Sequence, residues 1–88
     1  MELRVAVIGI IVENEKITEE LNNILHEYRQ YIIGRMGIPY RKRGINIISI
    51  AVDAPQDEIN AMSGKIGRLS GVKTKTAYSD VITKESYI

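Results

Sequence analysis

The side chains of this chain that could bind a ligand are mainly basic. Arg41-Lys42-Arg43 is the only dense basic group, and Arg35 lies six residues before its first member. Guanidinium and ammonium groups bind phosphates, carboxylates and the nucleic-acid backbone through charge-assisted hydrogen bonds. A solvated loop explains the same residues without any ligand, so the sequence leaves both interpretations open.

Three glycines, Gly34, Gly37 and Gly44, lie around this basic group. Glycine lets backbone N–H groups approach a ligand, but it also marks a β-bulge or a tight contact between subunits. The spacing of Gly34 and Gly37 matches neither phosphate-binding glycine fingerprint. We therefore expect a bulge or a subunit contact here.

The chain offers no set of residues for catalysis or metal binding. It has no cysteine, which excludes disulfides, thiolate metal sites, iron–sulfur ligation and cysteine nucleophiles. His26 is the only histidine, and a plain helix-surface histidine is the favoured interpretation. None of Ser49, Ser63 and Ser70 has a nucleophile motif such as G-x-S-x-G. We predict a protein without catalytic residues, metal or cofactor, and not an enzyme.

Length and charge indicate one small domain. The 88 residues leave room for a single core, and the net charge of +1 gives no strong nucleic-acid field over the whole surface. The longest apolar run, Val5–Val12, is far below the ~20 residues that span a bilayer, and no signal-peptide cleavage site follows it. We therefore expect a cytoplasmic protein with no membrane partner.

The hydrophobic pattern predicts the strands that would position the basic group. Leu3–Val12 is apolar at nearly every position, which is typical of a central strand buried on both faces. Two β-branched runs, Tyr31–Ile38 and Ile45–Val52, flank the polar break Pro39–Gly44 and predict a hairpin. Val72–Tyr78 alternates like an edge strand whose lysines prevent stray pairing.

Two helices are predicted from apolar residues at helical spacing. They are Ile17, Leu21, Ile24, Leu25 and Tyr28 for the first helix, and Ile59, Met62, Ile66 and Leu69 for the second. Gly71 is a suitable left-handed stop after the second helix. Met36 and Met62 are expected to pack in the core.

The predicted order is β-α-β-β-α-β, the α+β ferredoxin-like sandwich. Residues 1–78 would form this domain, and the segment 79–88 would be a C-terminal tail. The four strands would form an antiparallel sheet with the first and third in the middle, and both helices would cover one face. The other face is left open.

The open face is predicted to be too apolar for water. Sheets with one wet face normally alternate apolar and polar residues, and Leu3–Val12 and Ile45–Val52 mostly do not. Exposing several such side chains costs about 1.5–3 kcal/mol each, which is comparable to the stability of a small domain. We expect another subunit to cover the face. The alternative is the tail, folding over it through Val81, Ile82, Tyr87 and Ile88.

Three segments of the chain resemble one known family. They are I-G-R-M-G-I-P-Y (Ile33–Tyr40), V-I-G-I-I-V-E (Val7–Glu13) and S-G-K-I-G-R-L-S-G-V-K (Ser63–Lys73). The resemblance is to the iron-only hydrogenase system regulators, and it extends from Leu3 to Tyr78.

The resemblance implies an ACT-like fold, related to the C-terminal domain of the nickel-responsive repressor, in a small oligomeric regulator of an anaerobic bacterium. These relatives bind effectors, form oligomers and carry no catalysis. The nickel-responsive relative uses histidines and a cysteine as ligands, and this chain cannot supply that set. The chain also lacks an N-terminal DNA-binding arm, which argues against direct operator contact.

The leading hypothesis is a non-enzymatic regulatory or sensor module. It would act as a homo-oligomer, a dimer or a tetramer, that binds a small anionic effector between subunits. The candidate effector residues are Arg35, Gly37, Tyr40, Arg41 and Arg43. Two alternatives stay open: a nucleic-acid-binding regulator that uses the clustered basic loops, and a structural assembly partner of the hydrogenase machinery.

Overall fold

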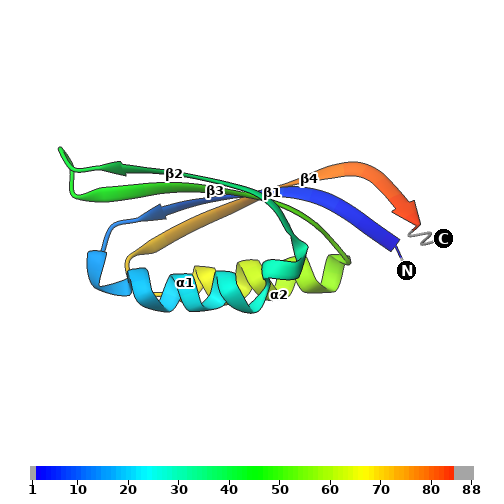
Figure 1. Cartoon of the computed structure of the whole chain (residues 1–88), viewed down its shortest axis with the longest axis horizontal. Coiled ribbons are helices and arrows are strands. Elements are labelled where there is room, and N and C mark those ends of the chain that lie inside the picture. Colours follow the sequence, from blue (N-terminus) through cyan, green and yellow to red (C-terminus); the bar gives the residue numbers. More distant parts are fainter. Residues whose placement is uncertain (1, 85–88) are drawn as a thin grey trace.

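The computed structural model of the chain describes residues 2–84. Its elements follow in the order β1 (Glu2–Val12), η1 (Glu15–Ile17), α1 (Thr18–Glu27), η2 (Arg29–Tyr31), β2 (Ile32–Tyr40), β3 (Ile45–Ala54), α2 (Gln56–Gly67) and β4 (Val72–Lys84). The strands form one antiparallel sheet in the order β2-β3-β1-β4, and both helices lie against one face of it (Figure 1). This confirms the predicted ferredoxin-like fold, with β1 and β3 in the middle.

The core lies between the sheet and the helices. Alternate residues of the central strands point into it, and the register places Ile8 opposite Ile50 and Ile10 opposite Ile48. The predicted stripe of the first helix is confirmed, because Leu21 and Leu25 are buried. From α2 the core receives Ile59, Met62 and Ile66.

An ion pair joins the two helices at their solvent side. Lys65 Nζ of α2 donates to Glu27 Oε2 of α1 at 2.7 Å, and it also lies 5.1 Å from the centre of the Tyr28 ring. The hydrogen bond to Glu27 raises the pKa of Lys65 above its ordinary value, with Tyr28 adding to the effect. Because both side chains are exposed, the pair contributes little to the stability of the fold.

The last strand is longer than the sequence predicts. The expected end was Tyr78, but β4 continues to Lys84, so residues 79–84 are strand and not tail. Tyr78 pairs with Ala6 and Ile82 pairs with Arg4, so three residues of β4 (79–81) oppose the single residue Val5 of β1 and form a bulge. The bulge breaks the period-two alternation, which is why the strand signal is lost there. The remaining tail residues, 85–88, lie outside the described residues.

The hairpin strands also extend beyond their predicted ends. β2 includes Pro39 and ends at Tyr40, which an edge strand tolerates because one side of its backbone needs no partner. The molecule measures 47 × 19 × 19 Å, with the β2–β3 turn at one end and the start of β1 and the end of β4 at the other (Figure 1). No helix within residues 2–84 is long and apolar enough to cross a membrane.

Gly71 is required where β4 begins. Its φ of +75° lies in the left-handed region, its carbonyl accepts the Glu13 N–H at 2.7 Å, and an added Cβ would lie 2.7 Å from the Asn14 Cβ. Gly44, in the β2–β3 turn, has a similar φ of +66° with open space around it.

We expect Gly71→Ala to lower the free energy of unfolding more than Gly44→Ala does. Both variants pay about 1–2 kcal/mol for the left-handed backbone, and Gly71→Ala adds about 1–3 kcal/mol for the collision with Asn14. Urea unfolding of both variants at one protein concentration measures the difference. Equal losses would show that the Asn14 contact is unimportant.

Candidate functional site

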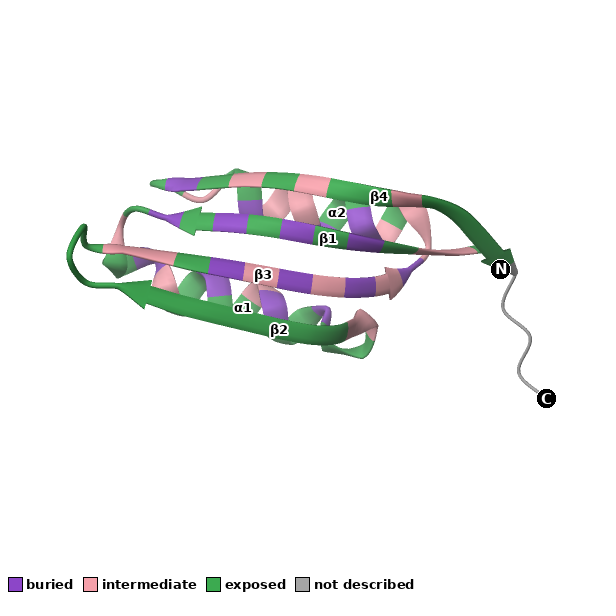
Figure 2. Ribbon diagram, turned by 90° about the horizontal axis from the view of Figure 1, so that it is seen from above, coloured by how far each residue is buried: buried purple, intermediate pink, exposed green. Residues whose placement is uncertain are grey.

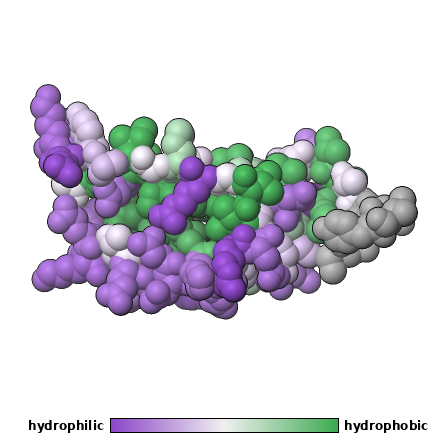
Figure 3. Space-filling view, viewed as in Figure 1, coloured by the Kyte–Doolittle hydropathy of each residue, from purple (hydrophilic) through white to green (hydrophobic). Residues whose placement is uncertain are grey.

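The face of the sheet away from the helices is largely apolar. We call this the open face. Seven large hydrophobic side chains lie on it, each between 41% and 61% exposed: Val5, Val7, Ile11, Met36, Ile38, Tyr40 and Ile47. Figure 2 shows buried and more exposed residues alternating along β1 and β3, and Figure 3 shows hydrophobic residues gathered on the sheet side. The expectation that β1 is buried on both faces is therefore wrong for a single chain.

Cross-strand rows make the open face continuous. One row runs Lys73–Ile11–Ile47–Ile38 across β4, β1, β3 and β2, and the next runs Lys75–Gly9–Ser49–Met36. The first row is a ridge of branched side chains, whereas Gly9 and Ser49 are small. Because the rows are adjacent, a ridge stands directly beside a low strip at the centre of the sheet.

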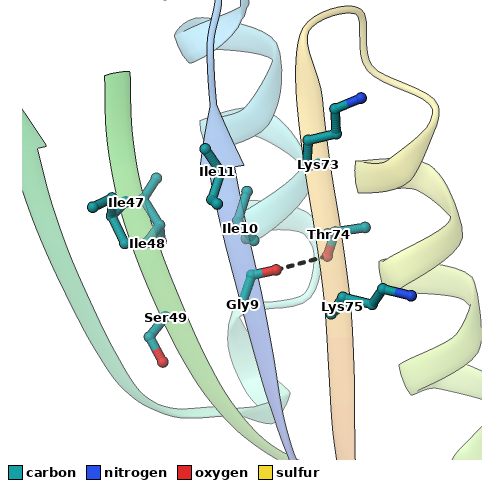
Figure 4. Close-up of a pocket in the computed structure, with 9 residues that line it drawn as sticks. All are labelled: Gly9, Ile10, Ile11, Ile47, Ile48, Ser49, Lys73, Thr74 and Lys75. Atoms are coloured by element: carbon teal, nitrogen blue, oxygen red, sulfur yellow. Dashed lines mark hydrogen bonds between the residues drawn. The ribbon is translucent and has the colours of Figure 1, made fainter. Parts of the chain in front are cut away.

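A shallow hollow of about 450 Å³ lies over this low strip. It is lined by Gly9, Ile10, Ile11, Ile47, Ile48, Ser49, Lys73, Thr74 and Lys75. Figure 4 shows these residues on three neighbouring strands, with the Thr74 hydroxyl donating to the Gly9 carbonyl at 3.0 Å. The hollow is mainly apolar, with two lysines on its β4 side.

The backbone does not require glycine at position 9. Its φ is not positive, and an added Cβ would meet only the Lys75 carbonyl oxygen, at an ordinary contact distance of 3.7 Å. A glycine inside a strand weakens the strand, and it often marks a place where another backbone or a ligand approaches closely. The bare surface at Gly9 is therefore a candidate contact point.

The lysines form a charged rim on the open face. Lys73 and Lys75 are exposed, and neither has a carboxylate within 4.0 Å among the described residues. An apolar centre with a charged, hydrated rim is the usual composition of a protein–protein interface. The sequence pattern identified these lysines only as protection of an edge strand.

The structure separates the candidate effector residues. Tyr40 pairs with Ile45 and lies on the open face, while Gly37 pairs with Ile48 on the helix side. Arg41 and Arg43 lie together in the exposed β2–β3 turn.

Arg35 is five residues before Tyr40, about 17 Å along the strand, and points to the helix side, where it contacts α1.

Two other sequence expectations can be compared with the structure. Met36 was expected in the core, and this is wrong: its side chain is 61% exposed on the open face, because it pairs with Ser49 and not with a buried residue. His26 is exposed on α1, as expected for a surface histidine. Within residues 2–84 no three His, Cys, Asp or Glu side chains gather as metal ligands would.

Comparison with known proteins identifies the family. A family model described as "TM1266-like: Iron-only hydrogenase system regulator, putative" matches residues 4–76. The chain belongs to the TM1266-like family. The solved structure of TM1266 from Thermotoga maritima is 35% identical in sequence, with a TM-score of 0.83, covering 86% of this chain and 96% of that protein. The matched span contains the whole open face, so the resemblance noted in the sequence is confirmed.

A more distant structural match shows the fold alone. A formyltetrahydrofolate deformylase from Pseudomonas putida KT2440 has a TM-score of 0.61 at 14% identity, over 82% of this chain. The chain spans only 28% of that protein. No functionally curated protein matches the chain.

Proposed function

We propose that this member of the TM1266-like family is a non-enzymatic regulatory module that acts as a homo-oligomer joined through the open face. The family description supplies the regulatory role. The observation that supports the assembly is the set of seven large, partly exposed hydrophobic side chains on one flat face.

The energetic argument favours burial of the open face. Each of the seven side chains is already about half buried, so covering it completely gains about 1 kcal/mol. A two-fold interface buries the same set from both copies, and the total gain of roughly 14 kcal/mol is as large as the upper part of the range for the association cost, about 4–15 kcal/mol. An 88-residue domain has little stability of its own to offset the exposure.

A second copy fits the open face better than an unrelated partner does. The ridge containing Ile11 and Ile47 stands beside the low strip at Gly9 and Ser49, so the face carries both a projection and a hollow that would accept it. A two-fold axis brings the same surface of two copies together, which lets the ridge of each copy enter the hollow of the other. The lysine rim of β4 stays at the margin, where the ammonium groups reach water.

The mass of the assembly in solution tests the proposal. Native mass spectrometry and sedimentation at micromolar concentration should give twice or four times the 9.9 kDa of one chain. The thermal midpoint should also rise with protein concentration, because association stabilises only the folded chain. A mass of one chain with a concentration-independent midpoint would contradict the assembly.

A second candidate function comes from the β2–β3 turn. Arg41, Lys42 and Arg43 are all exposed at one extremity of the molecule (Figure 1). An oligomer would display several such turns, which could contact a nucleic-acid backbone. This function predicts an affinity that falls steeply with salt, and a smaller slope when the three residues are replaced by glutamine. Binding that does not depend on salt would exclude it.

A further inference from the structure

A second hollow lies on the helix side of the sheet, between α1 and the edge strand β2. Its volume is about 330 Å³. It is lined by Asn22, Leu25, His26, Arg29, Ile32 and Arg35. These residues come from α1, η2 and β2, which follow one another along the chain. The hollow faces away from the open face, and it stands whether or not the chains associate.

Both arginines of this hollow are held by hydrogen bonds within the chain. Arg35 Nη2 donates to Asn22 Oδ1 at 3.0 Å, and Arg29 Nη1 donates to the His26 backbone carbonyl at 2.8 Å. Each of these bonds uses one of the five N–H donors of a guanidinium group. The bonds position the two groups beside the hollow and leave further donors available to a ligand.

The charge of the hollow is not balanced by the lining residues. None of the six is acidic, and within residues 2–84 neither arginine has a carboxylate oxygen within 4.0 Å. Arginine keeps its charge at any ordinary pH, so the two guanidinium groups place fixed positive charge at one concave site. Leu25 and Ile32 give the hollow an apolar part, while its four polar lining residues are exposed to water.

We infer that the hollow between α1 and β2 binds a small oxyanion, carried as a carboxylate or a phosphate, through Arg29 and Arg35. The planar guanidinium group matches the paired oxygens of both anions, which is why the two are treated as one ligand class. Arg35 is therefore an anion partner together with Arg29, and not together with Arg41 and Arg43 as the sequence suggested. Asn22 acts as a positioning residue, because it holds Arg35 against α1.

Amide chemical shifts test this inference directly. The ¹⁵N-labelled full chain is titrated separately with inorganic phosphate and with glutarate, at an ionic strength kept constant with sodium chloride. We expect saturable shifts at the amides near Asn22, Arg29 and Arg35 with at least one probe. Comparison of the two probes distinguishes a phosphate ligand from a carboxylate ligand.

Variants decide whether the arginines carry the binding. Arg29→Gln and Arg35→Gln should each lower the affinity for the more tightly bound probe about tenfold, because each removes a charge-assisted hydrogen bond. Arg43→Gln removes the same charge from the exposed turn and should leave the affinity unchanged. Arg35→Lys keeps the positive charge but loses the paired N–H donors of the guanidinium group. Its affinity should therefore lie between those of Arg35→Gln and the unaltered chain.

Two results would overturn the inference. If neither probe gives saturable shifts, the arginines only fasten α1 to its neighbours and the hollow is no site. If Arg43→Gln weakens binding as much as Arg35→Gln, the effect is general electrostatics. The assembly mass of these variants is measured in parallel, and it should not change because both arginines lie off the open face. Loss of the assembly is thereby distinguished from loss of anion binding.

Discussion

The Ile11→Asp variant is expected to be a folded single chain. Ile11 lies at the centre of the open face with 42% of its surface exposed, so aspartate there remains hydrated in the free chain and costs about 2 kcal/mol in stability, from the lost isoleucine burial and the low strand propensity of aspartate. In the proposed interface the same carboxylate would be pressed against apolar side chains, with only the rim lysine Lys73 beside it on β4, and burying a charge there costs several kcal/mol. Sedimentation should therefore show the mass of one chain, while far-ultraviolet circular dichroism stays unchanged.

The adjacent residue provides a matched control. Ile10 is 1% exposed and points into the core between the sheet and the helices, so Ile10→Asp should abolish the fold and the dichroism signal together. The two variants place the same charge one residue apart on β1, on opposite faces of the sheet. If Ile11→Asp keeps the assembly of the unaltered chain at equal concentration, the open face is not the interface.

Much of the fold could be predicted from the sequence because its local signals agree. The helical stripe through Leu21 and Leu25, the β-branched hairpin strands and the stop at Gly71 each predict an element that the structure contains. The end of β4 could not be predicted, because the bulge between Tyr78 and Ile82 removes the alternation that marks a strand. Pairing with the start of β1 extends the strand there, and that is a tertiary effect.

The candidate sites were harder to predict than the fold. Arg35 and Arg41 are close in sequence, but an extended strand carries them apart and turns Arg35 toward the helix side. Arg29 joins Arg35 because it lies in η2, the turn that leads directly into β2. The one available signal for the open-face hollow was Gly9, an isolated glycine inside a run of β-branched residues, which is unfavourable in a strand unless something occupies the space.

Gly9→Val is expected to have opposite effects on the fold and on the assembly. In a single chain the added side chain meets no closer atom than 3.7 Å from its Cβ, and replacing a strand glycine should stabilise the fold by about 0.5–1 kcal/mol. In the proposed assembly, the valine would fill the hollow that the ridge of the second copy enters. Overpacking of this kind costs about 1–3 kcal/mol, which weakens association by roughly 10- to 100-fold.

Two measurements separate these effects. Urea unfolding in the Ile11→Asp background gives the gain in the single chain, and sedimentation equilibrium of Gly9→Val alone gives the loss in association. Ala77→Val is the control, because it adds two of the same three carbon atoms to the open face on the edge strand β4, beyond the residues that line the hollow. If Gly9→Val associates as tightly as Ala77→Val, the hollow is not part of the interface. If the proposed assembly forms, a glycine that lowers the stability of its own strand is what selection for assembly, rather than for the stability of a lone domain, would retain.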